Sequence, residues 1–232
     1  MKKKRANRLK IAIAAITLVT VTFVGLTIFL FLRNDQATAS LLFQDNSCSV
    51  GCWHNFRPGI TTQQDVINFI EDKNLESNLM TRYNGLNTTY KDLPVRFFFF
   101  ENLLEVIKVA APQGGLDLTI SRVIDELGEP DAQVIETDDW NVVGPSLRGT
   151  LYFFEEGYSF TFLTLGDRGS QTVCFTEDLQ VKLFHVFAPD DHITMLRHAS
   201  GYGDGFGEFP DPQETEMKLE PWKGSSCYPI AS

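Results

Sequence analysis

Four cysteines carry the most specific chemistry in this sequence: Cys48, Cys52, Cys174 and Cys227. An even number of cysteines is typical of exported domains, in which thiols pair as disulfides. We predict that Cys48 pairs with Cys52 across a tight turn, and that Cys174 pairs with Cys227 and ties the C-terminal tail to a strand. The alternative is a four-cysteine metal site, but only one short spacing is present and a second C-x-x-C half is missing.

Histidines and aspartates near the C-terminus are the next candidates, because imidazole and carboxylate groups bind metals. The segment 190–192 (DDH) precedes His198 by six residues, and on a helix that step places His192 and His198 on different faces. Zinc-binding H-E-x-x-H pairs are four residues apart. We therefore expect Asp190 and Asp191 to cap a helix. His185 alternates within a predicted strand, where we expect a surface position.

A hydrolytic nucleophile lacks its usual context. No G-x-S-x-G motif occurs, and Ser146 and the pair Ser225-Ser226 have no assignable base. Paired acids at 138–139, 155–156 and 190–191 are typical of solvated turns. The glycines of 201–207 resemble a phosphate loop only superficially, since Asp204 and Glu208 would repel phosphate. We predict no catalytic residue, no metal site and no cofactor.

An uncharged apolar segment precedes all of these residues. Positions 11–32 reach the ~30 Å of a bilayer core at about 1.5 Å of helix rise per residue. Six basic residues precede the segment and only Arg33 follows it before Asp35, which predicts a cytoplasmic N-terminus. We predict a cytoplasmic basic tail over 1–10, a single transmembrane helix over 11–32, a linker over 33–47 and an extracytoplasmic domain over 48–232. The alternative is a cleaved signal peptide, whose apolar core is normally shorter.

Charge is divided unevenly along the chain. Seven of the 20 basic residues lie before residue 34, which leaves 13 basic against 30 acidic residues in the exported part. Such a surface repels nucleic acid and anionic lipid headgroups, and it would attract cations or a basic partner. We therefore exclude nucleic acid as a partner. Solvation of a secreted surface is the simpler interpretation.

The exported part is predicted to be an α+β domain, with helices packed on an antiparallel β-sheet. Helical patterns over 61–73 and 118–127 each begin at a threonine cap, and 190–199 is a third, shorter candidate. Aromatic and β-branched residues predict strands over 95–100, 103–111, 132–136, 150–155, 158–165, 172–176 and 181–188. Glu101-Asn102 predicts a hairpin turn, while no element is predicted over 84–89.

The order of helix and hairpin appears twice in this pattern. It allows two successive helix–hairpin units, 48–115 and 116–232, within the domain. The alternative is that short amphipathic helices resemble each other by their period alone.

Phenylalanine is frequent, with 19 in the chain. The aromatic runs at 97–100 and 152–154 place rings on both faces of their strands, which indicates a sheet covered on both sides. Helices would cover one face, and a second layer or a partner the other. Core packing is the default interpretation, and a partner surface is the alternative.

Two sets of short motifs resemble known families. Cys52-Trp53 followed by 57–62 (RPGITT) resembles the "CW…PG.TT" opening of uncharacterised exported and membrane-anchored bacterial proteins. These proteins also share a late strand ending, here 183–189, and a C-terminal "W.G…Y" element, here 222–228. More distantly, 118–130 resembles the helix of small BamE-like outer-membrane assembly and inhibitor-type modules, with Asp117 where a glycine is usual. This second resemblance implies a binding or scaffolding fold.

The expected function is therefore non-enzymatic. We expect a membrane-anchored binding or accessory module in the cell membrane, with a protein partner in or outside the membrane, as in a subunit of an envelope complex. An exported hydrolase of envelope material is one alternative, and an anchored sensor or inhibitor of another exported protein is the other. The sequence does not fix the oligomeric state.

Overall fold

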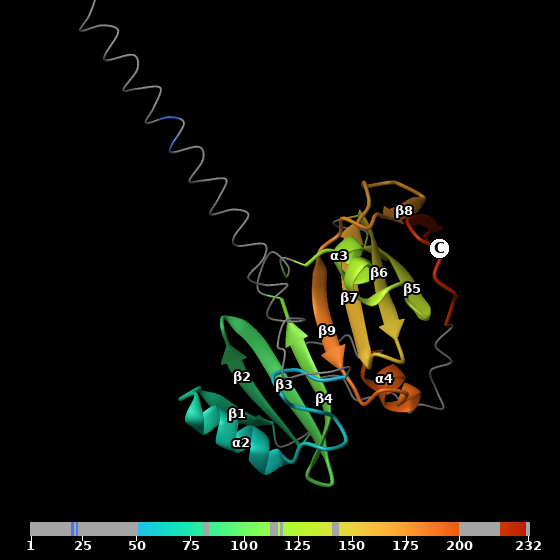
Figure 1. Cartoon of the computed structure of the whole chain (residues 1–232). Coiled ribbons are helices and arrows are strands. Elements are labelled where there is room, and N and C mark those ends of the chain that lie inside the picture. Colours follow the sequence, from blue (N-terminus) through green and yellow to red (C-terminus); the bar gives the residue numbers. More distant parts are fainter. Residues whose placement is uncertain are drawn as a thin grey trace, which may run out of the picture. The chain divides into compact units, whose positions relative to one another are not determined.

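The computed structural model describes Thr20, Thr22 and residues 51–80, 84–111, 116, 118–140, 144–199 and 219–230. The chain divides into two compact bodies, Met1–Gln44 and Asp45–Ser232, and the second carries the labelled elements of Figure 1. Among the described residues, no helix is long and apolar enough to cross a membrane. The predicted linker and Cys48 lie outside the described residues, as does the predicted span except for Thr20 and Thr22, so these remain predictions.

Within the described residues, eight antiparallel strands form one sheet in the order β1-β2-β3-β4-β9-β7-β6-β5 (Figure 1). The strands are β1 (Ser77–Met80), β2 (Gly85–Tyr90), β3 (Leu93–Phe100), β4 (Leu103–Ala110), β5 (Ala132–Trp140), β6 (Gly144–Phe153), β7 (Tyr158–Leu165) and β9 (Val181–Val186). The central strands β4 and β9 pair over four residues each. We call β1–β4 with α2 the first half, and β5, β6, β7 and β9 with α3 the second half. The predicted α+β class with an antiparallel sheet is confirmed.

Helix α2 (Gln63–Asp72) covers one face of the first half. Thr62 caps it and forms a capping box with Asp65, which satisfies two backbone N–H groups of the first turn. Its Phe69 packs edge-on against Phe56 at 5.0 Å, and Phe56 packs against the fully buried Phe97 of β3 at 5.6 Å. The face of β3 that carries Phe97 is therefore the α2 face.

Two-residue turns connect the strands of the first half. Lys91 and Asp92 join β2 to β3, and Glu101 and Asn102 join β3 to β4, all with positive φ between 48° and 68°. Turns of this kind match the twist of a hairpin. The predicted turn at Glu101-Asn102 is confirmed. From the sequence, no element is predicted over 84–89, and this is wrong, because residues 85–90 form β2. The Asn and Thr side chains of this strand conceal its alternating pattern.

Helix α3 (Ile120–Leu127) belongs to the second half, where it lies in front of β6 and β7 in Figure 1. Thr119 accepts a hydrogen bond from the backbone N–H of Arg122, and the helix ends at Gly128, which has a φ of 91°. Beside it, β5 and β6 are longer than the strands predicted at 132–136 and 150–155. The prediction of a turn at 138–139 is wrong, because these two acids lie within β5.

Both helices join the sheet through the same three backbone hydrogen bonds. In the first half these run from Gly59 N to Leu104 O (2.7 Å), from Leu104 N to Thr61 O (2.8 Å) and from Gln63 N to Asn102 O (2.8 Å). In the second half they run from Leu116 N to Val181 O (2.9 Å), from Val181 N to Leu118 O (2.8 Å) and from Ile120 N to Leu179 O (3.0 Å). Each helix is therefore attached to the start of the central strand of its own half.

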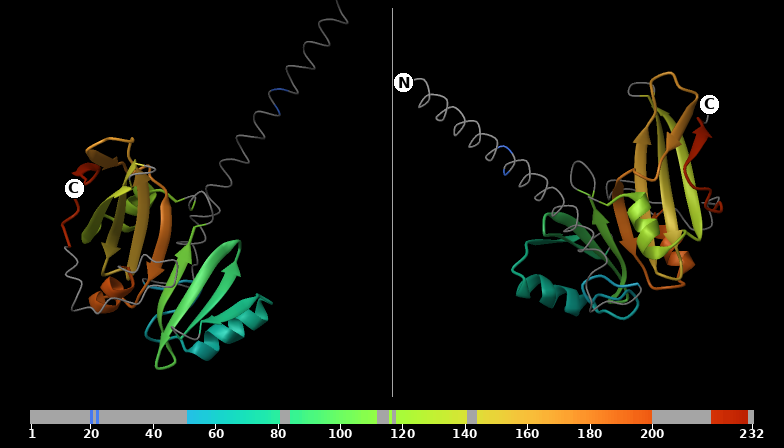
Figure 2. Two further views of the ribbon diagram at one scale, coloured as in Figure 1. Left: turned by 180° about the vertical axis from the view of Figure 1, so that it is seen from behind. Right: turned by 45° about the horizontal axis from the view of Figure 1, so that its top comes forward.

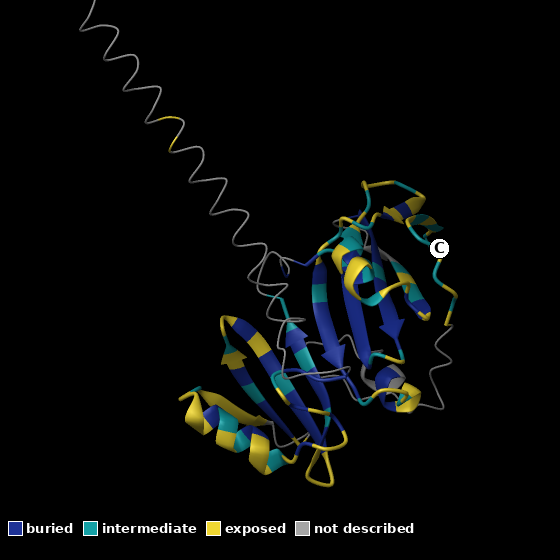
Figure 3. Ribbon diagram, viewed as in Figure 1, coloured by how far each residue is buried: buried dark blue, intermediate teal, exposed yellow. Residues whose placement is uncertain are grey.

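The second half is the more completely buried part of the sheet, as the dark strands β6, β7 and β9 of Figure 3 show. Gly149 of β6 lies beneath the ring of Phe162, and a Cβ atom added to Gly149 would lie 1.9 Å from Phe162 Cζ. By the matching hydrogen bonds of Leu104 and Val181, Phe162 corresponds to Phe99 of the first half, whose backbone N–H donates to Asn84 O at 3.0 Å. A glycine is needed at 149 because the ring occupies the space of its side chain.

The third helix, α4 (His192–Ala199), packs on the face opposite α2. Its Met195 is fully buried in a cluster with Phe98, Val106 and Tyr152, and Phe98 follows Phe97 in β3, so the two side chains point to opposite faces. The rear view in Figure 2 shows α4 beside the end of the second half. Asp191 accepts a hydrogen bond from Thr194 N at 3.1 Å, so the predicted cap is confirmed for Asp191.

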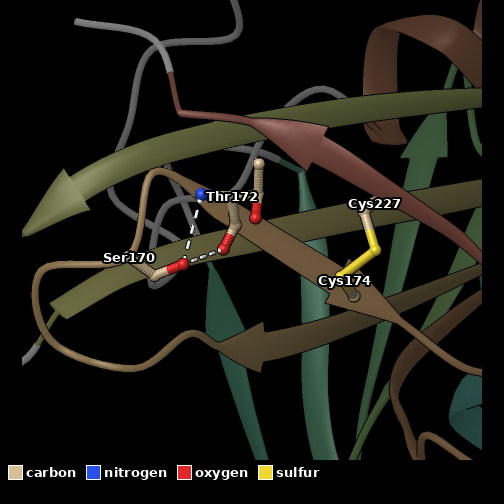
Figure 4. Close-up of a disulfide and its surroundings, with 4 residues drawn as sticks. All are labelled: Ser170, Thr172, Cys174 and Cys227. Atoms are coloured by element: carbon tan, nitrogen blue, oxygen red, sulfur yellow. Dashed lines mark hydrogen bonds between the residues drawn. A yellow bond between two sulfur atoms is a disulfide. The ribbon is translucent and has the colours of Figure 1, made fainter.

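A second, two-stranded sheet pairs β8 (Thr172–Phe175) with β10 (Ser226–Pro229) in the described part of the chain. Cys174 and Cys227 lie directly opposite each other and form a disulfide (Figure 4). The Ser170 hydroxyl donates to Thr172 O at 2.6 Å and accepts from Thr172 N at 3.2 Å, which shapes the turn before β8. The C-terminal segment is thus fixed to a strand, as predicted.

Candidate functional site

The predicted cysteine pairing is confirmed for Cys174 and Cys227. Cys52 is also disulfide-bonded, while Cys48 lies outside the described residues, so the pairing of Cys48 with Cys52 remains a prediction. No cysteine of the described part is a free thiol. The cysteines of the described part, Cys52, Cys174 and Cys227, therefore stabilise the fold and offer no nucleophile.

The four histidines are scattered across the domain. His54 lies in a turn before α2, His192 begins α4 with its ring stacked on Phe154 at 4.2 Å, and His198 lies further along α4. The surface position expected for His185 is wrong: its exposed fraction is 0% because β9 is a central strand. Among the described residues, no three His, Cys, Asp or Glu side chains gather as a metal site would require.

A buried pair of Ser159 and His185 was not predicted. Ser159 Oγ lies 3.1 Å from His185 Nδ1, across the neighbouring strands β7 and β9. A serine beside a histidine is the arrangement of many hydrolytic nucleophiles. Both residues have an exposed fraction of 0%, however, so a substrate has no access to them. Sequence spacing gives no signal of this pair, because only the strand register brings the two residues together.

A groove lined by described residues lies beside α2. Its volume is 470 Å³, and it lies among the turn before α2, one face of α2 and the end of β2. It is lined by His54, Asn55, Asp65, Asn68, Phe69, Asp72, Lys73 and Tyr90. From the sequence, a site role is predicted for none of these residues.

The turn before α2 holds His54 and Asn55 at the rim of the groove. Trp53 N donates to Phe56 O at 3.0 Å and Phe56 N donates to Trp53 O at 2.9 Å, which closes a two-residue turn. His54 and Asn55 have φ of 50° and 69°, as both central residues of such a turn require. Trp53 is almost fully buried and fixes the turn to the core.

Three aromatic rings form one wall of the groove, with Tyr90 in the middle. The Tyr90 ring lies 4.9 Å from His54 and 5.5 Å from Phe69, and all three side chains are half-buried. Lys91 Nζ lies 5.4 Å from the centre of the Tyr90 ring. This contact shows that the Tyr90 ring accepts a cation, as electron-rich aromatic faces do.

The polar part of the lining lies on the same helix as Phe69. Asp65, Asn68 and Asp72 follow one another at steps of three and four residues, which places them on one side of α2. Hydrogen bonds from the side chain of Thr62 at 2.7 Å, and then from its backbone N–H at 2.9 Å, hold the pKa of Asp65 below its ordinary value. Asp65 is therefore ionised at neutral pH.

Two carboxylates, two amides and three rings thus surround one cavity, in which Lys73 is the single lysine or arginine of the lining. Carboxylates attract a positive charge, rings hold both a cation and its hydrocarbon stem, and amides orient the group by hydrogen bonds. The arrangement is suited to binding a cationic side chain. It contains no nucleophile beside a base, which acyl transfer or hydrolysis would require.

Comparisons with protein-family models, with curated proteins and with solved structures find no match for this chain.

Proposed function

We propose that this chain is a membrane-anchored, extracytoplasmic binding module that holds a protein partner by a basic side chain in the groove beside α2. The observation that carries the proposal is the meeting of Asp65 and Asp72 with the rings of Phe69 and Tyr90 around one 470 Å³ cavity. Cavities of about 300–1,000 Å³ are typical of sites that enclose a small group.

Both the hydrocarbon stem and the charged end of a lysine or arginine side chain find suitable groups in this groove. Its hydrocarbon stem would lie along Phe69 and Tyr90, and its charge would lie between the two carboxylates. A cation over an aromatic face contributes about 0.5–2 kcal/mol, depending on how far it is desolvated. The acidic composition of the exported part, 13 basic against 30 acidic residues, favours the approach of a basic partner.

The proposal includes a duplicated fold, in which two copies of one helix-on-sheet unit share the eight-stranded sheet. The matching backbone hydrogen bonds of α2 and α3, the threonine caps Thr62 and Thr119, and the reversed strand order of the two halves support it. Counting from the caps, the positions of Asp65, Asn68, Phe69 and Asp72 correspond to Arg122, Asp125, Glu126 and Glu129. Arg122 and Glu126 pair at 2.9 Å, so that face of α3 neutralises its own charge.

Placement outside the cell membrane rests on the predicted span over 11–32 and on its flanking charges. The disulfide of Cys174 and Cys227 supports this placement, because structural disulfides persist in oxidising compartments. An anchor would hold the groove near partners in the same membrane.

The test is calorimetric titration of the full chain, in a neutral detergent, with short peptides that carry a single arginine, lysine or glutamine. We expect the arginine and lysine peptides to bind, and the glutamine peptide to bind about tenfold or more weakly, because it lacks the charge. Tyr90→Ala should weaken binding of the arginine peptide about fivefold or more through loss of the central ring.

Charge variants separate the groove from the general acidity of the domain. Asp65→Asn with Asp72→Asn should weaken binding of the arginine peptide by about tenfold, since both carboxylates of the groove are neutralised. Asp125→Asn on α3, with Glu129→Gln just after the helix, makes the same change of net charge and should alter binding by less than about twofold. Equal binding of all three peptides, or equal losses in both double variants, would contradict the proposal.

A further inference from the structure

The described sheet has two outer edges, one at β1 and one at β5. At the β5 edge, Gln133 N donates to Glu220 O at 2.8 Å and Glu220 N donates to Gln133 O at 2.9 Å. The hydroxyl of Thr137 also donates to Pro229 O at 3.2 Å. A segment from near the C-terminus therefore covers part of the β5 edge, and it does so through backbone groups.

The β1 edge has no such cover among the described residues. β1 pairs with β2 on one side, and no described strand pairs with its other side. Alternate residues of an edge strand direct their backbone N–H and C=O groups away from the sheet. The sequence of β1, SNLM, contains neither a proline nor a charged residue, which are the features that usually block the addition of a strand. β1 is therefore open to a further strand.

Leu79 gives this edge an apolar contact. Its side chain is 64% exposed, and it lies directly opposite Leu86 of β2, which is buried and lies opposite Phe97 of β3. Directly paired residues project from the same face of a sheet, so Leu79 extends an apolar row on the α2 face to the edge. A strand added at β1 would cover Leu79 with a side chain of its own.

The groove beside α2 lies near one end of β1. Thr88 of β2 pairs with Ser77, the first residue of β1, and Tyr90 follows Thr88 by two residues. Asp72 and Lys73, which also line the groove, come shortly before β1 in the chain. The groove therefore lies beyond the Ser77 end of β1, on the face that α2 covers.

Direction and charge favour one kind of occupant at β1. Every strand pair of the described sheet is antiparallel, and an antiparallel strand at β1 would run toward Ser77, so that its C-terminal continuation arrives beside the groove. The exposed charges there are Glu71, Asp72 and Glu76 against Lys73, which favours a basic continuation. A second copy of the chain would bring the same acidic surface to this edge.

We propose that β1 binds an extended segment of a protein partner as an added antiparallel strand, and that a lysine or arginine just C-terminal to this strand enters the groove beside α2. The second part rests on the proposed function, and the first part does not. Backbone groups of the segment hydrogen-bond with the outer edge of β1, and one apolar side chain covers Leu79.

The test is fluorescence anisotropy of labelled peptides with the full chain in neutral detergent. The main peptide carries a short valine–threonine strand followed by one arginine. One comparison peptide places the arginine before the strand, and the other replaces the strand with glycine and serine. We expect the main peptide to bind about tenfold or more tightly than either, because it alone reaches the edge and the groove together.

Backbone methylation tests the added strand without altering the protein. N-methylation of alternate peptide residues blocks the N–H groups that face β1 in one series, and those that face solvent in the other. The first series should weaken binding by about fivefold or more, and the second by less than about twofold. Equal effects of the two series would overturn the added strand.

A change of the protein tests the contact at Leu79. Leu79→Ser should weaken binding of the main peptide about threefold or more, because the apolar contact at the edge is lost. The matched control is Leu165→Ser at the end of β7, where the leucine is 59% exposed, and it should change affinity by less than about twofold. Thermal unfolding checks that both variants are folded. Equal losses in the two variants would place the peptide away from β1.

The two parts of the proposal fail separately. If the groove does not take the basic side chain, arginine and glutamine forms of the main peptide bind equally, while methylation of the facing series still weakens both. If no strand is added, the main peptide binds no better than the glycine–serine peptide, and the preference of the groove for arginine remains. A dimer of the full chain that the main peptide dissociates, measured by light scattering, would assign the edge to a second copy and overturn the proposal.

Discussion

The two halves of the sheet have the same attachment of helix to strand but different helix faces. In the first half, α2 presents Asp65, Phe69 and Asp72 toward rings from other segments. In the second half, Arg122 and Glu126 pair with each other on the surface of α3. The groove therefore depends on the side chains that α2 carries and on the turn that precedes this helix. The backbone hydrogen bonds that attach the helix to the sheet are the same in both halves.

Two buried rings, Phe97 and Phe162, show how the halves differ inside the core. Phe97, opposite Leu86, packs against Phe56 in the loop that leads into the groove. Phe162 lies over Gly149 and packs against Phe175 of β8 at 4.9 Å. The ring of the first half therefore supports a binding site, and the ring of the second half supports the disulfide-bonded sheet.

Removal of the disulfide should produce the largest effect and should break the second half first. Cys174→Ala with Cys227→Ala frees a loop of 53 residues in the unfolded chain, and loss of such a cross-link costs about 2–5 kcal/mol of unfolding free energy. Thermal and denaturant unfolding measure this loss. Affinity for the arginine peptide at low temperature should change by less than about twofold, and a larger change would show that the groove depends on the second half.

Filling the glycine beneath Phe162 should be the next largest effect. Gly149→Ala forces the ring or the strand to move, at a cost of about 1–3 kcal/mol in unfolding free energy. Phe162→Leu in the same chain relieves the clash, so the double variant should be more stable than the sum of the single variants predicts. Additive losses in denaturant unfolding would show that the ring does not require the glycine.

The elements with a strong local signal were predictable from the sequence. Thr62 and Thr119 each stand before an apolar helical face, and aromatic runs flank Glu101-Asn102, so both helices and the β3–β4 hairpin follow from short-range physics. In β2, the Asn and Thr residues of GLNTTY lack an apolar period, and pairing with β3 decides the structure there.

The groove could not be predicted in the same way. His54, Asp65 and Tyr90 lie in three separate segments, and only the packing of α2 over β2 and β3 brings them together. The pair of Ser159 and His185 depends on strand register, which one sequence does not specify across distant strands. His185 was expected at the surface because its local alternation does not reveal that both faces of β9 are covered.

Removal of the threonine helix caps should have a smaller effect on the unfolding free energy. This effect should depend on pH in the first half and not in the second. Thr62→Ala and Thr119→Ala should each cost about 0.5–2 kcal/mol at neutral pH. Because the pKa of Asp65 is lowered in the folded state, its contribution is present above its ordinary pKa of 3.8 and is lost as pH falls through the lower folded value. The cost of Thr62→Ala should therefore shrink below about pH 4.

The matched cap in α3 supplies the control for this pH dependence. Arg122 occupies the position of Asp65 there, so the cost of Thr119→Ala should not fall in the same range. Denaturant unfolding of both variants at neutral and acidic pH measures the difference. A parallel fall for both threonines would show that Asp65 is not the titrating group.

The central claim is that the groove of the first half, and not its counterpart on α3, binds a basic side chain. Hydrogen exchange of the full chain with and without saturating arginine peptide tests it most directly, because both helices are observed in one experiment. The account predicts slower exchange in the turn 53–56, in α2 and at the end of β2, with α3 unchanged. Protection of α3 in their place, or no protection in either helix despite saturation, would contradict it.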